Sequence, residues 1–242
     1  MTVIIIDDEP LARSIVKEYL SSCAGIELLA ERGDGFEGIK AIQQLHPDLI
    51  FLDIQMPKIN GFEMLELIEN PPAVIFTTAF DEFAIKAFEL NAVDYLLKPF
   101  SKERFIKAVQ KYQQNQVLPD TRRIIESAAE SPLQQNRIVV KDGSKIKIIP
   151  VGKIYFLEAA DDYVKIATED GIFLKKRTMS FFEKSLSAYH FIRVHRSYIV
   201  NTQLITRIDL HEKDSYIILL TTGAKIPVSK AGYLKLKEVL GI

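Results

Sequence analysis

The sequence predicts an α/β fold, a doubly wound parallel sheet of five strands, followed by a second domain that is predominantly β. In residues 1–116, five short apolar runs alternate with segments whose apolar residues recur every three or four positions. This pattern is typical of buried strands that are each followed by an amphipathic helix. Beyond residue 136, several runs alternate apolar and polar residues, and Asp-Gly or Thr-Gly pairs separate them, which indicates hairpins.

The charge distribution also divides the chain. Residues 1–116 hold 11 Lys and Arg against 18 Asp and Glu, whereas residues 137–242 hold 18 against 11. Residues 117–136 are mostly polar and contain two prolines, as is typical of a linker. We therefore expect an acidic domain (1–116), a linker (117–136) and a basic domain (137–242) whose partner is polyanionic.

The strands of the first domain are expected at residues 3–6, 26–30, 48–52, 73–77 and 93–97. A helix follows each strand, and the four-residue spacing of Leu11 and Ile15 illustrates the apolar face of the first. Ser101 is suited to cap the last helix, while Asp81 and Asn91 are suited to bound the helix before it. Such an alternation predicts a parallel sheet that is covered on both faces.

The second domain is expected to contain nine short strands, with helical patterns only near residues 179–188 and 231–240. Residues 191–200 are expected to form one strand. If that strand is continuous, alternation places Arg193, His195 and Ser197 on one face and the residues between them on the other.

Composition limits the class of protein. Hydrophobic residues make up 48% of the chain and charged residues 26%, as in soluble globular proteins. No apolar stretch has the length of a membrane span, and the N-terminal apolar run is too short for a signal peptide. The single cysteine, Cys23, cannot form an internal disulfide, which fits a reducing compartment. We expect a cytoplasmic protein with no membrane partner.

Five polar side chains follow the carboxyl ends of the expected strands, namely Asp7, Asp8, Asp53, Thr78 and Lys98. Ligands of doubly wound sheets bind at this edge. Close carboxylates repel one another, and Mg²⁺ relieves the repulsion while leaving a position for a phosphoryl oxygen. Asp53 would then be the nucleophile that forms an aspartyl phosphate, with Lys98 and Thr78 stabilising the transferred group.

Other interpretations compete with this one. A turn into the next helix would also explain an aspartate after a strand, because Pro57 and Gly61 follow shortly. A haloacid-dehalogenase-type phosphatase needs a second Asp two residues after its nucleophile, whereas Glu9 stands two residues after Asp7. A nucleotide-binding domain would need a glycine-rich phosphate loop, and the sequence has none.

The segments IIDDEP, IFLDIQMPKINGFEML, IFTTAF and DYLLKPF resemble the receiver domain of two-component response regulators, over the whole of residues 1–116. The resemblance implies a flavodoxin-like sheet with the strand order 2-1-3-4-5. It implies Mg²⁺ held by Asp8, Asp53 and the backbone carbonyl of Gln55, with Asp7 helping through water. Asp53 would be the phosphoacceptor, served by a histidine kinase.

The same resemblance implies a switch. Thr78 would reorient toward the phosphoryl group, and Tyr95 would turn inward behind it. These movements would change the surface of the fourth helix and fifth strand. The peptide bond between Lys98 and Pro99 would be cis, which proline permits at a small free-energy penalty.

The segments FLEAADDYVKI, FIRVHRSYIVN and KIPVSKAGYLKLKEVL are similar to successive blocks of the LytTR DNA-binding domain, a match that covers residues 137–242. The resemblance implies that loops between strands, and no recognition helix, enter successive major grooves. Its base-facing positions correspond to the loop Asp161–Tyr163, to His195 and Arg196, and to Lys230 before the last helix. Arg196 is the candidate guanine reader because a guanidinium matches the O6 and N7 acceptors.

Lys175, Lys176 and Arg177 are expected to contact phosphates and so position the domain. These expectations combine into a phosphorylation-controlled transcription regulator, which would not be a metabolic enzyme. Phosphorylation of Asp53 would favour a homodimer, and the dimer would place two basic domains on paired or repeated sites of double-stranded DNA. The alternative is a receiver-controlled protein-interaction module without sequence-specific DNA binding.

Overall fold

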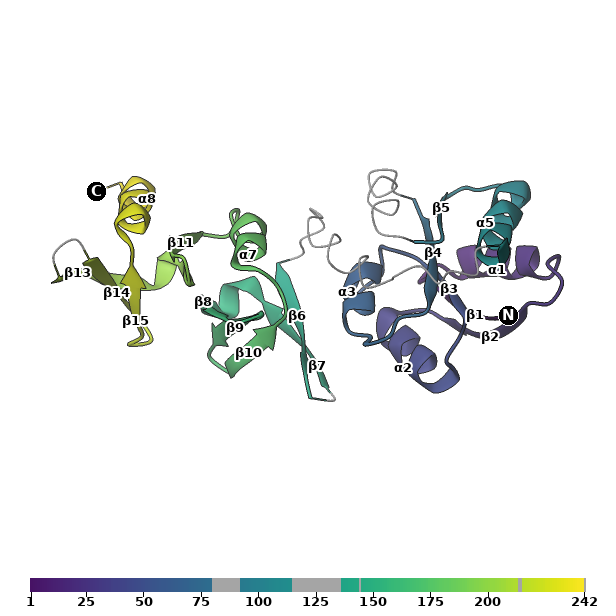
Figure 1. Cartoon of the computed structure of the whole chain (residues 1–242), viewed down its shortest axis with the longest axis horizontal. Helices are drawn as coiled ribbons and strands as arrows, with labels where there is room; N and C mark the ends of the chain where they lie inside the picture. The colour runs from purple at the N-terminus through teal and green to yellow at the C-terminus, as the bar shows by residue number, and fades with distance from the viewer. Residues whose placement is uncertain (80–91, 115–135, 144, 213–214, 242) are drawn as a thin grey trace. The chain divides into compact units, whose positions relative to one another are not determined.

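The computed structural model describes residues 1–79, 92–114, 136–143, 145–212 and 215–241, and the chain divides into two compact units, residues 1–129 and 130–242 (Figure 1). The predicted helix between the fourth and fifth strands, with its caps Asp81 and Asn91, lies outside the described residues. The linker also lies outside them, apart from Asn136. The domain boundaries at residues 116 and 137 therefore stay a prediction.

The first unit contains a parallel sheet with the order β2-β1-β3-β4-β5, which confirms the predicted topology (Figure 1). Its strands are β1 (Thr2–Ile6), β2 (Glu27–Arg32), β3 (Leu49–Leu52), β4 (Ala73–Thr78) and β5 (Asp94–Leu97). Strands β3 and β4 are buried along their whole length. Because helices cover both faces of the sheet, every side chain of such a central strand is buried, and its sequence is an uninterrupted apolar run.

The described helices of this unit are α1 (Pro10–Leu20), α2 (Gly35–Leu45), α3 (Gly61–Glu66) and α5 (Lys102–Gln114). On one face, α1 and α5 share a core with the sheet, and Phe105 of α5 stacks on Phe51 of β3 with ring centroids 4.9 Å apart. On the other face, a Cβ at Gly38 of α2 would lie 2.9 Å from Ile6 Cδ1 and 3.1 Å from Met64 Sδ of α3. The two faces thus carry α1 with α5 and α2 with α3 (Figure 1).

Local hydrogen bonds explain where these helices begin. Asn60 and Glu63 form a reciprocal capping box at the start of α3, each side chain accepting the other's backbone N–H at 2.8 Å. At the start of α2, the Asp34 side chain accepts the Glu37 N–H at 2.9 Å. The predicted cap Ser101 accepts the Arg104 N–H at 3.2 Å and is confirmed. Each cap lies where a loop that follows a strand ends and the next helix begins.

The second unit is predominantly β, as predicted. Its strands are β6 (Arg137–Asp142), β7 (Lys145–Pro150), β8 (Ile154–Ala160), β9 (Tyr163–Thr168), β10 (Gly171–Lys175), β11 (Phe191–His195), β12 (Tyr198–Asn201), β13 (Ile205–Glu212), β14 (Ser215–Leu220) and β15 (Lys225–Val228). They form antiparallel sheets with the orders β10-β9-β8-β12-β11, β13-β14-β15 and β6-β7. The described helices of this unit are α7 (Met179–Ser185) and α8 (Lys230–Leu240), with short 3-10 turns η2 (Val151–Lys153) and η3 (Thr202–Leu204).

Among the described residues, two hydrophobic cores stabilise this unit, and the β11–β12 pair belongs to both. Phe191 and Ile199 pack in the core that contains α7, whereas Val194 and Val200 pack in the core that contains α8. Successive residues of a strand point to opposite faces, so this pair of short strands is held between the two cores.

The expected single strand over residues 191–200 is wrong. The chain turns at Arg196 and Ser197, and β11 pairs with β12 as a hairpin whose register shifts between Arg193 and His195. A local hydrogen bond favours the turn, because the Ser197 N–H donates to His195 Nδ1 at 3.2 Å. The alternation argument therefore fails here, and Arg196 lies at the tip of a hairpin.

Candidate functional site

An acidic pocket lies at the carboxyl ends of β1 and β3. Asp7 follows β1 and is 1% exposed, Asp53 follows β3 and is 4% exposed, and Asp8 lies beside them. One ligand atom from each of these three residues lies within 4.8 Å of the others. Hard carboxylate oxygens at this separation fit a small divalent cation such as Mg²⁺.

Lys98, from the end of β5, inserts its ammonium between two of these carboxylates. The Nζ atom lies 2.8 Å from Asp7 Oδ2 and 3.1 Å from Asp53 Oδ2. Its peptide bond to Pro99 is cis, as the resemblance implied. Desolvation lowers the pKa of Lys98, but hydrogen bonds and charges from both aspartates outweigh it and leave that pKa raised.

Burial dominates the electrostatics of the aspartates. It raises the pKa of Asp53 to about 6, because the nearby Asp7 charge adds to the desolvation while Lys98 and the Gln55 N–H oppose it. Burial also raises the pKa of Asp7, against the opposing hydrogen bond and charge of Lys98. The pocket thus carries more negative charge than one ammonium can offset, which is the electrostatic setting of a cation site.

Two other predicted residues, Gln55 and Thr78, follow or end the strands at the pocket, and a third, Tyr95, lies within β5. Gln55 donates its backbone N–H to Asp53 Oδ1 at 3.2 Å. The Thr78 hydroxyl at the end of β4 is fully buried and has no hydrogen-bond partner within the described parts of the chain. Tyr95, which was expected to turn inward, is already buried at 7% exposure in this structure.

Two residues that the sequence analysis did not assign hold the pocket in place. Arg13 of α1 donates from Nη1 to the Asp7 carbonyl at 2.7 Å. Gly61 approaches the loop after β3 so closely that a Cβ would lie 2.4 Å from the Asp53 carbonyl oxygen. Neither role could be predicted, because Arg13 looks like any helix-surface cation and Gly61 like an ordinary turn glycine.

In the second unit, the structure brings two of the predicted DNA-contacting segments together. Ser229 donates from its N–H and its Oγ to the Val194 carbonyl, at 2.9 and 3.1 Å. A Cβ at Gly232 would lie 1.9 Å from the same oxygen. The first turn of α8, with the exposed Lys230, therefore packs directly on β11, close to the turn that carries Arg196.

The remaining predicted DNA contacts differ in their accessibility. Tyr163 is 45% exposed at the start of β9, and Lys176 is exposed after β10. Lys175 is partly buried and donates from Nζ to the Val139 carbonyl of β6 at 2.7 Å. The guanidinium of Arg177 lies 5.6 Å from the centroid of the Phe181 ring. Lys175 and Arg177 are thus engaged inside the domain, while Lys176 extends toward solvent.

His195 sits at the base of the hairpin turn. Its Nδ1 accepts the Ser197 N–H, so in the neutral ring the proton lies on Nε2. Burial lowers the pKa of His195, and the charges of Arg196 and Arg193 lower it further. The neutral ring therefore presents one N–H donor beside the exposed Arg196.

Two family models match the chain, the response regulator receiver domain over residues 3–110 and the LytTr DNA-binding domain over residues 144–241. The sensory transduction protein LytT of Bacillus cereus is 33% identical over 246 residues, with 100% of both chains covered. The transcriptional regulatory protein BtsR of Escherichia coli is 35% identical over 251 residues, with 99% of both chains covered. The response regulatory domain of protein mrkE from Klebsiella pneumoniae is 35% identical over 47% of this chain and 96% of its own, with a TM-score of 0.44.

The sheet order, the acidic pocket and the two matched domains together define a response regulator that binds DNA. Within that class, the chain belongs to the LytTR family, in which a receiver domain precedes a LytTr DNA-binding domain. No helix in the described part of the chain is both long and apolar enough to cross a membrane.

Proposed function

We propose that this response regulator is controlled by transfer of a phosphoryl group from a histidine kinase to Asp53. One observation carries the proposal: the buried Asp53 carboxylate lies in a cluster of three acids and 3.1 Å from the Lys98 ammonium. A structural turn needs neither the burial nor the convergence of these groups, whereas an in-line phosphoryl acceptor needs both.

Asp8, Asp53 and the backbone carbonyl of Gln55 would hold Mg²⁺, with Asp7 acting through water. When bound, the ion neutralises the clustered carboxylates and adds positive charge beside the phosphoryl oxygens. The chemistry of the donor set supports this assignment, since all the groups offered are hard oxygen ligands.

Lys98 and Thr78 would stabilise the charge of the transferred group. The Lys98 ammonium already faces Asp53, and the Thr78 hydroxyl is a buried donor that lacks a partner among the described residues. A phosphoryl oxygen would satisfy that hydroxyl. Tyr95, on the neighbouring strand β5, would then report the change to the surface of the unit.

The output would be sequence-specific binding to double-stranded DNA by a phosphorylation-dependent homodimer on paired or repeated sites. Arg196, His195, Lys230 and Tyr163 would face the bases from loops and a helix start, and Lys176 would contact phosphate. Lys175 and Arg177 would contact DNA phosphates only after giving up their present contacts inside the domain. Such a protein would work in the cytoplasm and would not be a metabolic enzyme.

The receiver assignment is tested by labelling with a small phosphodonor such as acetyl phosphate. We expect incorporation that requires Mg²⁺ and disappears in Asp53→Asn. Asp48→Asn is the matched control, because Asp48 lies in the same unit and binds Thr2 outside the pocket. Undiminished labelling of Asp53→Asn would refute the site.

The output is tested by selecting bound DNA from a random pool, with and without phosphodonor. We expect a preferred sequence whose affinity falls steeply with salt, because phosphate contacts release counterions. Equal binding to all sequences, or a flat salt response, would instead favour the protein-interaction module.

A further inference from the structure

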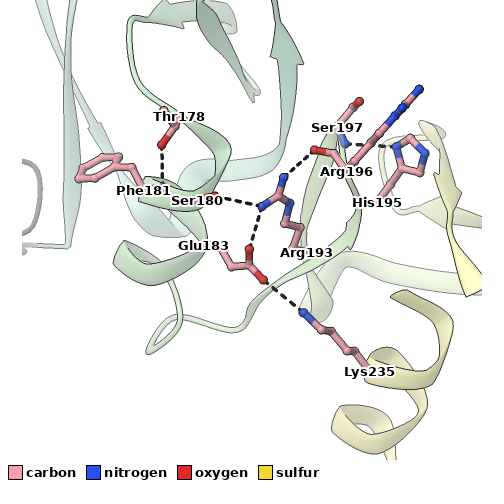
Figure 2. A network of polar contacts seen from close by, with 9 residues as sticks. All are labelled: Thr178, Ser180, Phe181, Glu183, Arg193, His195, Arg196, Ser197 and Lys235. Atoms are coloured by element: carbon pink, nitrogen blue, oxygen red, sulfur yellow. Dashed lines mark hydrogen bonds and ion pairs between the residues drawn. The ribbon is translucent and has the colours of Figure 1, made fainter. Parts of the chain in front are cut away.

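One arginine side chain ties the β11–β12 hairpin to helix α7 (Figure 2). Arg193 donates from Nη2 to the Arg196 carbonyl at 2.9 Å and from Nη1 to Glu183 Oε2 at 3.0 Å. The same Nη1 lies 3.4 Å from Ser180 Oγ. A single planar guanidinium therefore joins the backbone of the hairpin tip to the helix beneath it.

Glu183 extends this connection to helix α8. Its Oε1 accepts from Lys235 Nζ at 3.3 Å while its Oε2 is taken by Arg193 (Figure 2). Burial raises the pKa of Glu183, but the hydrogen bonds and charges of Arg193 and Lys235 outweigh it and hold that pKa below its usual value. An acid in a basic domain is thus kept ionised with both oxygens paired, so it repels an approaching phosphate less than a free carboxylate would.

This contact constrains the backbone from which the Arg196 side chain extends. Arg196 is exposed at the tip of a short turn, so packing does not fix it. Its carbonyl is held by Arg193, which sets where the side chain leaves the backbone. Bidentate recognition of a base edge requires that starting point to be held within a fraction of an ångström.

We propose that Arg193, held by Glu183, is a positioning residue for base reading: it sets the sequence discrimination of Arg196 without itself contacting DNA. The side chain of Arg193 is only 24% exposed and its guanidinium is engaged with protein groups, which leaves little of it for a phosphate. The inference rests on the proposed reading role of Arg196.

The test uses the full-length protein and the DNA site that it selects from a random pool. Affinity is measured for that site and for the site changed at the base pair where Arg196→Ala loses discrimination. Discrimination is the ratio of these two affinities. We expect Arg196→Ala to lower this ratio about 10-fold or more, and Arg193→Lys to lower it by a comparable factor. Lysine keeps the charge but lacks the fork that reaches Glu183 and the Arg196 carbonyl together. The affinity of Arg193→Lys for unrelated DNA, and its salt dependence, should therefore match the wild type.

Glu183→Gln weakens the same contact from its α7 side and leaves every residue of the hairpin unchanged. It removes a negative charge from a DNA-binding domain, so affinity for unrelated DNA should stay equal or rise while discrimination falls. A purely electrostatic role predicts the rise without the fall. Asp209→Asn is the matched control, because it also removes a carboxylate charge and breaks an exposed ion pair, here with Arg207 on β13, and it should preserve discrimination.

The double variant separates the possible outcomes. If Arg193 acts through Arg196, then Arg193→Lys adds no further loss of discrimination to Arg196→Ala. A further loss in the double variant, or full discrimination in both Arg193→Lys and Glu183→Gln, overturns the inference but leaves the proposed reading role of Arg196 standing. Full discrimination in Arg196→Ala overturns the proposed reading role and the inference with it. Melting of each variant is followed by far-UV circular dichroism, and Glu183→Gln provides the decision if Arg193→Lys fails to fold.

Discussion

Removing the charge of Asp53 should stabilise the protein when no metal is bound. The pKa of this buried carboxyl rises from 3.8 to about 6, first through desolvation and then through the Asp7 charge, against the pull of Lys98. A difference of about 2 pKa units at 1.36 kcal/mol each corresponds to roughly 3 kcal/mol of destabilisation by the ionised form. Because the Asp53 side chain is almost fully buried, solvent screening reduces this figure little. We therefore expect Asp53→Asn to raise the free energy of unfolding by about 2 to 3 kcal/mol at pH 7.

The pH dependence follows from the sign of the shift. A raised folded-state pKa means that the folded protein holds the Asp53 proton more tightly than the unfolded chain does. The penalty is therefore absent below the unfolded value of 3.8, grows as pH rises toward about 6, and is constant above that. The advantage of Asp53→Asn should be about half complete near pH 5 and complete by pH 7.5. Asparagine can still accept the Gln55 N–H, and Lys98 keeps Asp7 at 2.8 Å, so the substitution removes charge more than it removes contacts.

The assay is calorimetric and circular-dichroism melting in EDTA between pH 5 and pH 7.5, since the chain has no tryptophan for fluorescence. The unfolding transition whose midpoint temperature rises when Mg²⁺ is added is assigned to the first unit. Mg²⁺ should reverse the order of stability, because the wild type gains binding free energy that the variant forfeits with its ligand. An Asp53→Asn protein that is no more stable than the wild type in EDTA at pH 7 would refute this electrostatic reasoning.

Three further predictions concern single sites. Gly232→Ala should destabilise the second unit by about 3 kcal/mol, because the new Cβ would lie 1.9 Å from the Val194 carbonyl oxygen. Melting measures this loss, and Gly152→Ala, whose Cβ would face open space, should leave stability almost unchanged. Thr78→Val should leave stability unchanged or raise it by about 1 kcal/mol, since the buried hydroxyl has no partner among the described residues, but phosphodonor should no longer raise DNA affinity. Burial and the adjacent arginines lower the pKa of His195. The stability that its neutral ring contributes should therefore be complete above pH 6.5 and lost as pH falls below that value. His195→Asn should remove this dependence of unfolding free energy on pH, measured by melting at acidic pH.

The sequence alone determined the architecture and the receiver pocket. Parallel strands covered on both faces must be apolar throughout, so β3 and β4 stand out as uninterrupted runs. The polar residues that follow such strands must meet at one edge, because parallel strands share a direction. The sequence therefore suffices to bring Asp7, Asp53 and Lys98 together, and in the structure the Lys98 ammonium lies within hydrogen-bond distance of both aspartates.

Only the tertiary structure decided how the DNA-binding unit is held. A period of two cannot separate one long strand from a hairpin with a two-residue turn, so the break at Arg196 was missed. Likewise, sequence spacing says nothing of partners that lie far apart in the chain. Lys175 turns inward to the Val139 carbonyl, and Arg193 finds Glu183 on another element. The spacing of apolar and polar residues indicates which way a residue faces within its own helix or strand. Its hydrogen-bond partners depend on how helices and strands pack against one another, which is a property of the whole fold.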